Sequence, residues 1–424
     1  MTPLNIAVIG GGIVGISSAE WLRRDGHNVT LIDRNDPGTP AQTSYGNAGI
    51  LAVSSYIPVP VPGLLKKVPG LLFGQDGPLY LKWGYLPRLM PWLLPFLRRA
   101  NETDVMRTVE ALGTITDDTV DQHKALAEGT PATAHIVPGI YAFLYPSRAA
   151  CEADSWGHGL RQSRGVEIEF RDRARLLEDD PHLGTRYNYA ACHHGHGWIT
   201  DPGAYVAALF GHFRAEGGAF RQGEVDDIAG DGRVTIAGET ETYDRVVLAG
   251  GAWSAKLAAR LGHDPGLESE RGYHILFAGA SRRPPFPYML ADSKFVATPM
   301  ERGVRCAGQV EFGGLEAGPS EAPYRLVHKR IKQLYPDMEW SGEERWLGHR
   351  PSTVDSVPFI GPSPKAPNIH FAFGAQHIGL TTGPRTGRLI ADMIGGRTPN
   401  IDMTPFAVGR FDKGRGPARA DATR

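Results

Sequence analysis

The chain has 424 residues, of which 41% are hydrophobic and 21% charged, the composition of an ordinary globular protein rather than a disordered or fibrous one. Its 45 basic residues nearly cancel its 46 acidic ones, which argues against a nucleic-acid partner. This length exceeds what one core usually serves, so we expect two domains or one large composite unit.

The cysteines and the N-terminal segment indicate a cellular compartment. Cys151, Cys192 and Cys306 are scattered without a paired spacing, which argues against a disulfide scaffold and fits a reducing environment. A glycine-rich motif begins almost at Met1, so we expect no signal peptide. No apolar run is long enough to cross a bilayer. We therefore expect a cytoplasmic protein.

The first 33 residues read as a strand, a glycine-rich turn, a helix and a second strand that ends in an acid. The strand Asn5–Ile9 leads into Gly10–Gly15, and the helix Ile13–Arg24 stops near Gly26. The second strand, Val29–Asp33, ends about twenty residues after the glycines. This order and spacing are typical of a unit that binds a dinucleotide.

Each part of this unit has a physical role. Gly10 permits the tight turn, Gly12 lets the backbone approach a pyrophosphate, and Gly15 lets the helix pack closely on the strand. The N–H groups at the helix N-terminus bind the phosphates, and Asp33 is placed to accept from a ribose hydroxyl. The expected dinucleotide contacts are Gly10, Gly12, Ile13, Val14, Gly15, Asp33 and Arg34.

Residues 56–99 follow a loop rich in Pro, Gly, Thr and Ser, and they mix many prolines with tryptophan, leucine and phenylalanine. The prolines exclude one long helix, so we expect short helical turns and extended pieces. One interpretation is an apolar cover over the body of the protein. The other is a peripheral contact with the inner face of a membrane, with basic residues such as Lys66 and Arg98 near the headgroups.

The remaining pattern alternates helices and strands. The expected elements are a polar helix over 103–128, strands over 140–145 and 167–170, a helix over 204–216, and buried strands over 244–249 and 369–373. Strands that run into glycine loops recur at three distant places. They predict an α/β fold in which one nucleotide-binding sheet is assembled from separated segments.

The run Cys192–His196 suggests a metal site. Strand alternation would split its side chains between two faces, and no partner pair stands at zinc spacing elsewhere. We therefore predict no metal site and interpret the run as a polar sheet strand ahead of Asp201.

Several further segments match one family. They are Thr43–Gly49, Gly250–Ser254, Arg271–His274, Trp346–Pro351 with the residues up to Gly361, and Gly374–Pro384. With the N-terminal unit, they make the chain resemble the FAD-dependent D-amino-acid oxidase and dehydrogenase superfamily over nearly its whole length. It is most similar to the bacterial D-amino-acid dehydrogenases and their relatives that act on cyclic amino acids such as D-proline or D-hydroxyproline.

The resemblance implies two domains. A Rossmann-like FAD-binding domain is expected from 1–90, 196–262 and 345–412, and a substrate domain with a mixed, largely antiparallel sheet from 91–195 and 263–344. Residues 413–424 are expected to form a disordered tail.

The resemblance also implies the flavin contacts. They are Thr43, Ser44, Asn47, Ala48, Gly49, Gly250, Ala252, Trp253, Gly379, Leu380, Thr381 and Thr382. A helix is expected to start at Pro384 and to point its N-terminus at the flavin, where its dipole stabilises negative charge on the reduced ring. Relatives that bind FAD covalently carry a cysteine where Gly348 stands, so we expect non-covalent FAD.

The catalytic candidates are Arg350, Tyr273 and His377. In the family, the arginine at the position of Arg350 grips the substrate carboxylate, a task that suits its planar and permanently charged fork. Tyr273 and His274 could contact substrate, but alternation places only one of them on the pocket side. His377 stands where many oxidases of the family have glycine, whose carbonyl receives the substrate amine, so its imidazole would narrow the pocket or add a polar contact.

The implied reaction is the oxidation of a small amino acid by hydride transfer from Cα to flavin N5. An alternative is the oxidation of N-methylated or glycine-like secondary amines. An NAD-dependent dehydrogenase and a non-catalytic flavin-binding protein remain as further alternatives. The electron acceptor, oxygen or a quinone of a respiratory chain, stays open, as do the stereochemistry and the oligomeric state.

Overall fold

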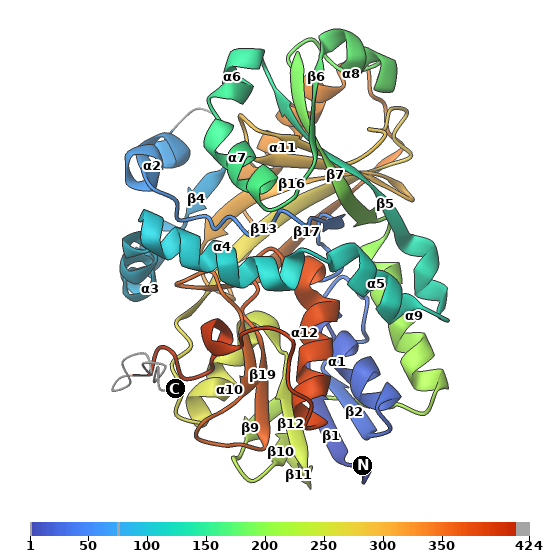
Figure 1. Ribbon diagram of the computed structural model, residues 1–424, viewed down its shortest axis with the longest axis vertical. Coiled ribbons are helices and arrows are strands. Elements are labelled where there is room, and N and C mark those ends of the chain that lie inside the picture. The colour runs from blue at the N-terminus through green and yellow to red at the C-terminus, as the bar shows by residue number, and fades with distance from the viewer. Residues whose placement is uncertain (1, 74–76, 413–424) are drawn as a thin grey trace, which may run out of the picture.

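The computed structural model describes residues 2–73 and 77–412, so the predicted tail over 413–424 lies outside the described residues. Two large sheets divide the molecule (Figure 1). The sheet with β1, β2, β12 and β19 fills the lower half of the view, and the sheet with β5, β7, β13 and β16 fills the upper half. Among the helices described, none has both the length and the apolar character needed to cross a bilayer.

The lower sheet follows the order β18-β19-β12-β1-β2-β8 in the described residues. Its strands are β1 (Asn5–Ile9), β2 (Asn28–Asp33), β8 (Ala219–Gln222), β12 (Arg245–Leu248), β18 (Phe359–Pro362) and β19 (Ile369–Phe373). All pairs are parallel except β18 with β19. The predicted assembly of one sheet from separated segments is therefore confirmed.

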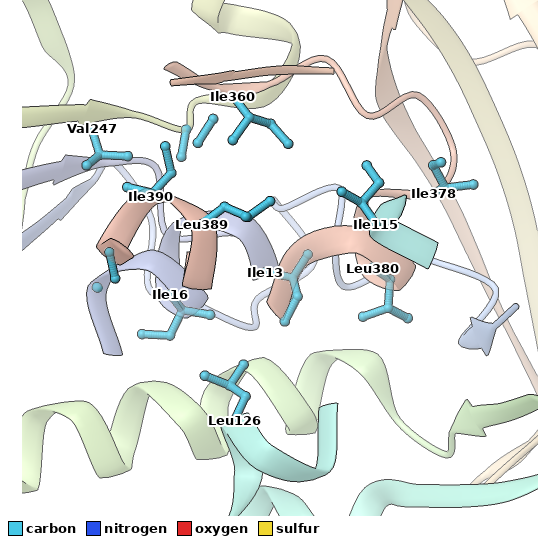
Figure 2. Packing of buried hydrophobic residues seen from close by; sticks show 14 of the residues in the cluster. Ile13, Ile16, Ile115, Leu126, Val247, Ile360, Ile378, Leu380, Leu389 and Ile390 are labelled. Atoms are coloured by element: carbon cyan, nitrogen blue, oxygen red, sulfur yellow. The ribbon is translucent and has the colours of Figure 1, made fainter. Parts of the chain in front are cut away.

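Two helices pack together on the lower sheet. They are α1 (Ile13–Arg24) and α12 (Gly379–Ile394), which share a core of aliphatic side chains (Figure 2). Ile16, Leu389 and Val247 are fully buried in this core. The helices α4 (Glu102–Thr116), α5 (Thr119–Ala127) and α9 (Pro202–Ala215) contribute further residues to the same cluster. Burial of such side chains stabilises each by roughly 1.5–3 kcal/mol.

The upper sheet follows the order β17-β13-β16-β15-β14-β5-β7-β3, with β4 paired to β16 and β6 to β7. Its strands are β3 (Ile50–Leu51), β4 (Leu79–Leu81), β5 (Ile136–Tyr145), β6 (Ile168–Asp172), β7 (Tyr189–Ile199), β13 (Leu267–Ala278), β14 (Tyr288–Leu290), β15 (Phe295–Met300), β16 (Gly303–Phe312) and β17 (Gly342–Thr353). Most pairs are antiparallel, and α11 (Glu321–Leu334) packs against one face. The predicted α/β fold class with a mixed second sheet is confirmed, whereas the domain boundaries stay a prediction.

The remaining elements are short. They are α2 (Leu64–Phe73), α3 (Leu86–Arg98), α6 (Arg148–Glu152), α7 (Ser155–Ser163), α8 (Arg173–Asp179), α10 (Ser254–Arg260), the small sheet of β9 (Val225–Ile228), β10 (Arg233–Ile236) and β11 (Glu239–Thr242), and the 3-10 turns η1 (Trp83–Tyr85), η2 (Pro131–His135), η3 (Gly251–Trp253) and η4 (Thr404–Phe406). Within 56–99, the described residues form α2, η1, α3 and β4 rather than one long helix, as predicted. The prolines do not limit the segment to single turns, however, because α2 continues through Pro69 and the 13-residue α3 continues through Pro91 and Pro95. The single helix expected over 103–128 is wrong, because the chain breaks between α4 and α5 at Asp117 and Asp118.

The helix expected to start at Pro384 instead begins at Gly379, so this prediction is wrong. A proline inside a helix leaves the carbonyl four residues earlier without its N–H donor. That carbonyl belongs to Leu380, and it accepts a hydrogen bond from His123 Nε2 at 2.9 Å. His123 Nδ1 lies 2.8 Å from the Tyr205 hydroxyl, which donates to it. Burial lowers the pKa of His123 to about 4, so the ring is neutral at pH 7.

This contact predicts a specific coupling between His123 and Pro384. We expect His123→Leu to destabilise the protein by about 2 kcal/mol or more, because a buried carbonyl and the Tyr205 hydroxyl both lose a partner. In a Pro384→Ala background, the new N–H can satisfy Leu380, so the same change should cost about 1 kcal/mol less. Urea unfolding of the four variants measures this coupling. Equal costs in both backgrounds would show that His123 does not replace the missing donor.

Candidate active site

A cavity of about 2090 Å³ is lined by residues of both large sheets. Its wall includes the glycine turn after β1, the loop over 43–48, the end of β17 and the segment that precedes α12. The cavity therefore joins the segments that the sequence singled out, although hundreds of residues separate them along the chain.

The glycine turn has the close contacts that a dinucleotide site needs. Gly10 has a φ of 107°, and a Cβ on it would lie 2.5 Å from the Ala249 carbonyl oxygen. A Cβ on Gly15 would lie 1.7 Å from the Gly10 carbonyl oxygen, so only glycine permits this packing. Gly12 precedes α1 without a side-chain cap, and the Ile13 N–H donates to Ser44 Oγ at 2.9 Å. The other N–H groups of the first turn stay available to a phosphate, which fits FAD.

Asp33 and Arg34 line one part of the cavity. The Asp33 carboxylate accepts from the Gly11 N–H at 2.6 Å and from the Asn35 N–H at 2.8 Å. A carboxylate has about four lone-pair sites, so it can still accept from a ribose hydroxyl. The Arg34 guanidinium lies 4.5 Å from the ring centroid of Trp253, which in turn meets His349 edge to face. This stacked group forms an aromatic part of the cavity wall near Asp33.

Most of the predicted cofactor residues line the cavity. They are Gly10, Gly12, Ile13, Val14, Asp33, Arg34, Thr43, Ser44, Asn47, Ala48, Gly250, Ala252, Trp253, Gly379, Leu380 and Thr381. The other three lie beside it and support its wall. Gly15 packs α1 on the turn, Gly49 packs against Ile199, and the Thr382 hydroxyl donates to the Ile378 carbonyl within α12. Their individual roles in binding stay predictions.

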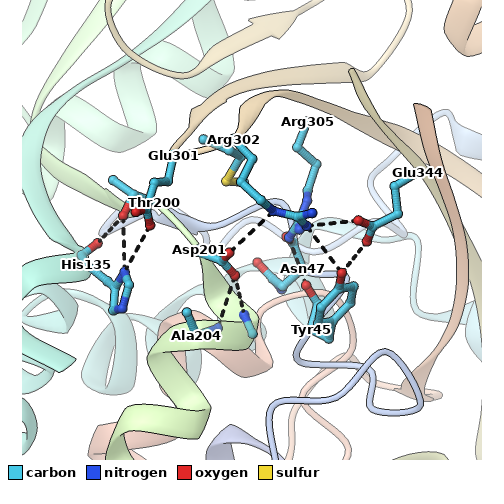
Figure 3. Close-up of polar contacts among 12 residues, drawn as sticks. Tyr45, Asn47, His135, Thr200, Asp201, Ala204, Glu301, Arg302, Arg305 and Glu344 are labelled. Atoms are coloured by element: carbon cyan, nitrogen blue, oxygen red, sulfur yellow. Dashed lines mark hydrogen bonds and ion pairs between the residues drawn. The ribbon is translucent and has the colours of Figure 1, made fainter. Parts of the chain in front are cut away.

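The loop over 43–49 is fixed by two side chains of the upper sheet. Arg305 on β16 is 1% exposed, and its Nη1 donates to the Tyr45 carbonyl at 2.8 Å and to the Asn47 carbonyl at 2.7 Å (Figure 3). Burial lowers the pKa of Arg305 to about 10, so it remains charged at pH 7. His274 on β13 lies with Nδ1 3.0 Å from the Gly46 carbonyl. Arg305 was not among the site residues predicted from the sequence, although an arginine among the apolar residues of a strand could have indicated a buried functional group.

Tyr273 and His274 point to opposite sides of β13. A Cβ on the neighbouring Gly272 would lie 2.6 Å from Arg350 Cζ. Gly272 and Tyr273 both line the cavity, whereas His274 is not among its lining residues. The Tyr273 side chain is buried, and its hydroxyl donates to Glu311 Oε2 at 2.6 Å and accepts from the Ser320 N–H at 3.1 Å. The Tyr273 hydroxyl is thus held by Glu311 and Ser320, while the residue itself belongs to the cavity lining. Its contact with substrate stays a prediction.

Arg350 lies across the bare backbone of Gly272. Its Nη1 donates to the Gln309 carbonyl at 3.1 Å, and the side chain lines the cavity. The buried Glu270 is its cross-strand neighbour, and the field of Glu270 favours the charged guanidinium. Burial acts in the opposite direction and lowers the pKa of Arg350, but an arginine stays protonated in proteins. A charged fork with free donors thus faces the cavity.

His377 is exposed, because it faces the cavity rather than the packed core. Burial and the charge of Arg350 lower the pKa of His377 to about 4, so the imidazole is neutral at pH 7. The preceding Gln376 has a φ of 47°, and its N–H donates to the Pro351 carbonyl at 3.0 Å. This contact holds the segment before α12 against the end of β17, one residue from Arg350.

The histidine-rich run Cys192–His196 lies on β7, as expected for a sheet strand. His193 and His196 are buried, and His196 Nε2 lies 3.0 Å from Ser54 Oγ. Over residues 2–73 and 77–412, no three or more His, Cys, Asp and Glu side chains gather in a way that could hold a metal ion.

Comparisons with known proteins identify the family of the chain. Residues 5–393 match the family model of the FAD dependent oxidoreductases. The chain is 38% identical to the D-amino-acid oxidase of Bradyrhizobium diazoefficiens, over 96% of this chain and 99% of the relative. It is 30% identical to D-amino acid dehydrogenase 2 of Ralstonia nicotianae, over 96% of this chain and the full length of the relative.

Solved structures share the fold. The glycine oxidase of Geobacillus kaustophilus has a TM-score of 0.71 at 21% identity, and it covers 96% of this chain and 99% of its own. The L-proline dehydrogenase of P. horikoshii has a TM-score of 0.72 at 17% identity, with 97% and 98% covered.

The contacts of Arg305 predict its effect on flavin binding. We expect Arg305→Met to weaken FAD binding by about 10-fold or more, because the loop over 43–49 loses two charge-assisted hydrogen bonds. Arg302→Met is the matched control, since Arg302 is half exposed, pairs with Glu344 and meets the loop at the Tyr45 hydroxyl rather than at a backbone carbonyl (Figure 3). FAD titration of the apoprotein by fluorescence quenching measures both variants. Equal affinities for the two variants would contradict the role of Arg305.

Proposed function

The chain belongs to the FAD dependent oxidoreductase family, and from this premise we propose that it oxidises the amine of a small D-amino acid or of a cyclic amino acid such as D-hydroxyproline. That it is an FAD-dependent enzyme acting on amino acids follows from the family and from relatives that match over nearly their whole length. The substrate and the mechanism are our proposal.

The observation that carries the proposal is the charged fork of Arg350 in the cavity wall, beside the segment that leads into α12. One N–H group of Arg350 donates to the Gln309 carbonyl, and its other N–H groups can bind both oxygens of an α-carboxylate. A glycine at position 272 is required for this placement, because any Cβ there would meet the guanidinium. A surface or purely structural arginine would not need this arrangement.

Other groups of the chain complete the binding of substrate. With the carboxylate on Arg350, we propose that the amine donates to the His377 carbonyl, while the neutral imidazole limits the size of the substrate side chain. The N-terminus of α12 has no side-chain cap on Ile378, so its dipole favours negative charge at this point. When bound, FAD supplies a two-electron oxidant that accepts a hydride from Cα, and we nominate no side-chain base because a neutral amine needs none.

The residues that line the cavity help to distinguish this function from the alternative functions. An NAD-dependent dehydrogenase would not need the loop over 43–49 or the segment before α12, and both line this cavity. The buried cysteines Cys151, Cys192 and Cys306 do not line it, which supports non-covalent FAD. Oxidation of glycine-like or N-methylated amines remains the second candidate, because the solved structures that share the fold include a glycine oxidase.

An apolar branch of the same cavity bears on the electron acceptor. Its lining includes Leu64, Leu72 and Phe73 of α2 and reaches Trp83 in η1. Phe73 and Trp83 are 70% and 60% exposed, and their rings stack at 6.0 Å. We propose that the exposed end of this apolar branch rests on a membrane surface. A quinone would then enter the branch from the bilayer and reach the flavin through it.

Arg350 gives the direct test of substrate binding. We expect Arg350→Met to raise KM for carboxylated substrates by about 100-fold, the effect of losing charge-assisted hydrogen bonds of roughly 3 kcal/mol in total. FAD content should stay unchanged. Arg345→Met, on the exposed part of β17 where it pairs with Glu321, should leave KM unaltered. Steady-state kinetics with an artificial dye provides the measurement, and an unchanged KM in Arg350→Met would refute the assignment.

The exposed aromatic rim gives a second test. The holoenzyme should sediment with vesicles of anionic phospholipid, and a Phe73→Ser/Trp83→Ser variant should bind them at least several-fold more weakly. This variant should reduce a dye at the normal rate but a membrane quinone more slowly. Phe170→Ser on β6 is the control, because Phe170 is also exposed but lies outside the cavity lining. If the wild-type protein does not bind vesicles, the membrane proposal is wrong.

A further inference from the structure

A second guanidinium, that of Arg161, lines the cavity. Arg161 lies on α7, and its Cζ is 5.1 Å from the ring centroid of Phe143. Its Nε is buried without a hydrogen-bond partner, and no ion pair or hydrogen bond joins this guanidinium to any residue in the described parts of the chain. Arg161 is half-buried, because it faces the cavity, so its guanidinium can bind a ligand there.

Arg161 is surrounded by aromatic side chains and by one carboxylate, that of Asp154, which also lines the cavity. Tyr141 and Phe143 of β5 form the adjacent wall of the cavity. Asp154 is the carboxylate whose field acts on Arg161, but Asp154 Oδ2 accepts from the Tyr145 hydroxyl at 2.8 Å and forms no ion pair with it. The neighbouring His193 adds no second positive charge at pH 7, since burial and the field of Arg161 lower its pKa to about 2.

Such a site is suited to an anion that arrives with the ligand. A guanidinium that faces a cavity without an ion-pair partner has lost part of its hydration, and a carboxylate bound in its fork would offset that loss. Arg350 already provides the site for one carboxylate in the same cavity. A ligand with two carboxylates would therefore satisfy both cations, and its methylene groups would lie along Tyr141 and Phe143.

We propose that Arg161 binds the side-chain carboxylate of an acidic amino acid, while Arg350 binds its α-carboxylate. The substrate class is then a dicarboxylic amino acid of the aspartate and glutamate type. This inference rests on the proposed function, because it assumes that an amino acid occupies the cavity with its α-carboxylate on Arg350.

The test compares acids with their amides in the holoenzyme. We expect kcat/KM for D-aspartate, D-glutamate or D-2-aminoadipate to exceed that for the matched amide by at least tenfold, and the best chain length reports the spacing between the two arginines. Arg161→Gln should abolish this preference and leave the amides unchanged, and Arg161→Lys should restore part of it. Arg148→Gln, an exposed arginine on α6, is the control.

Binding without turnover separates this inference from the proposed function. Calorimetry of the FAD-loaded protein should show tighter binding of glutarate than of butyrate, and Arg161→Gln should remove the difference. If neutral D-amino acids are oxidised but acids show no preference at any chain length, the role of Arg161 is overturned while the proposed function stands. If no amino acid is oxidised, the proposed function fails, and a glutarate preference that survives Arg161→Gln would overturn the anion site itself.

Discussion

The hydrogen bonds from Arg305 to the carbonyls of Tyr45 and Asn47 are the contact on which the site depends. Arg305 belongs to the upper sheet, whereas the loop that carries these carbonyls leaves the lower sheet after β2. A buried guanidinium cannot move to another position without leaving its charge unsolvated, so the loop has one stable place. Ser44 then reaches the N-terminus of α1, and Asn47 lies near the His377 carbonyl.

The cavity between the sheets suits anions in several places. The N-termini of α1 and α12 both lie at its wall without a side-chain cap on the preceding residue, and each contributes a positive dipole end. Arg350 and Arg161 add full charges. A dinucleotide with its pyrophosphate and an amino acid with its carboxylate are ligands that match this field.

Local sequence patterns predicted the local structure well. The helix Ile13–Arg24 and the strand Ile369–Phe373 have the expected bounds, because glycines and apolar periodicity mark their ends. The start of α12 could not be predicted, since the carbonyl left open by Pro384 is satisfied by His123, which lies 257 residues from Leu380 in the sequence. The same holds for Tyr273: the sequence predicts a place in the cavity wall, but only the fold shows that its hydroxyl binds Glu311 and Ser320. Arg305 and Arg161 belong to no local sequence motif, so their contacts could be identified only from their positions in the fold.

The central claim is that this cavity binds and oxidises an amino acid. The most direct measurement is anaerobic mixing of the FAD-loaded protein with D- and L-amino acids, proline analogues and N-methylglycine, followed by the flavin absorbance near its visible maximum. The account predicts rapid bleaching by a D-amino acid or a cyclic amino acid. Bleaching by N-methylglycine alone, or by none of these compounds, would contradict it.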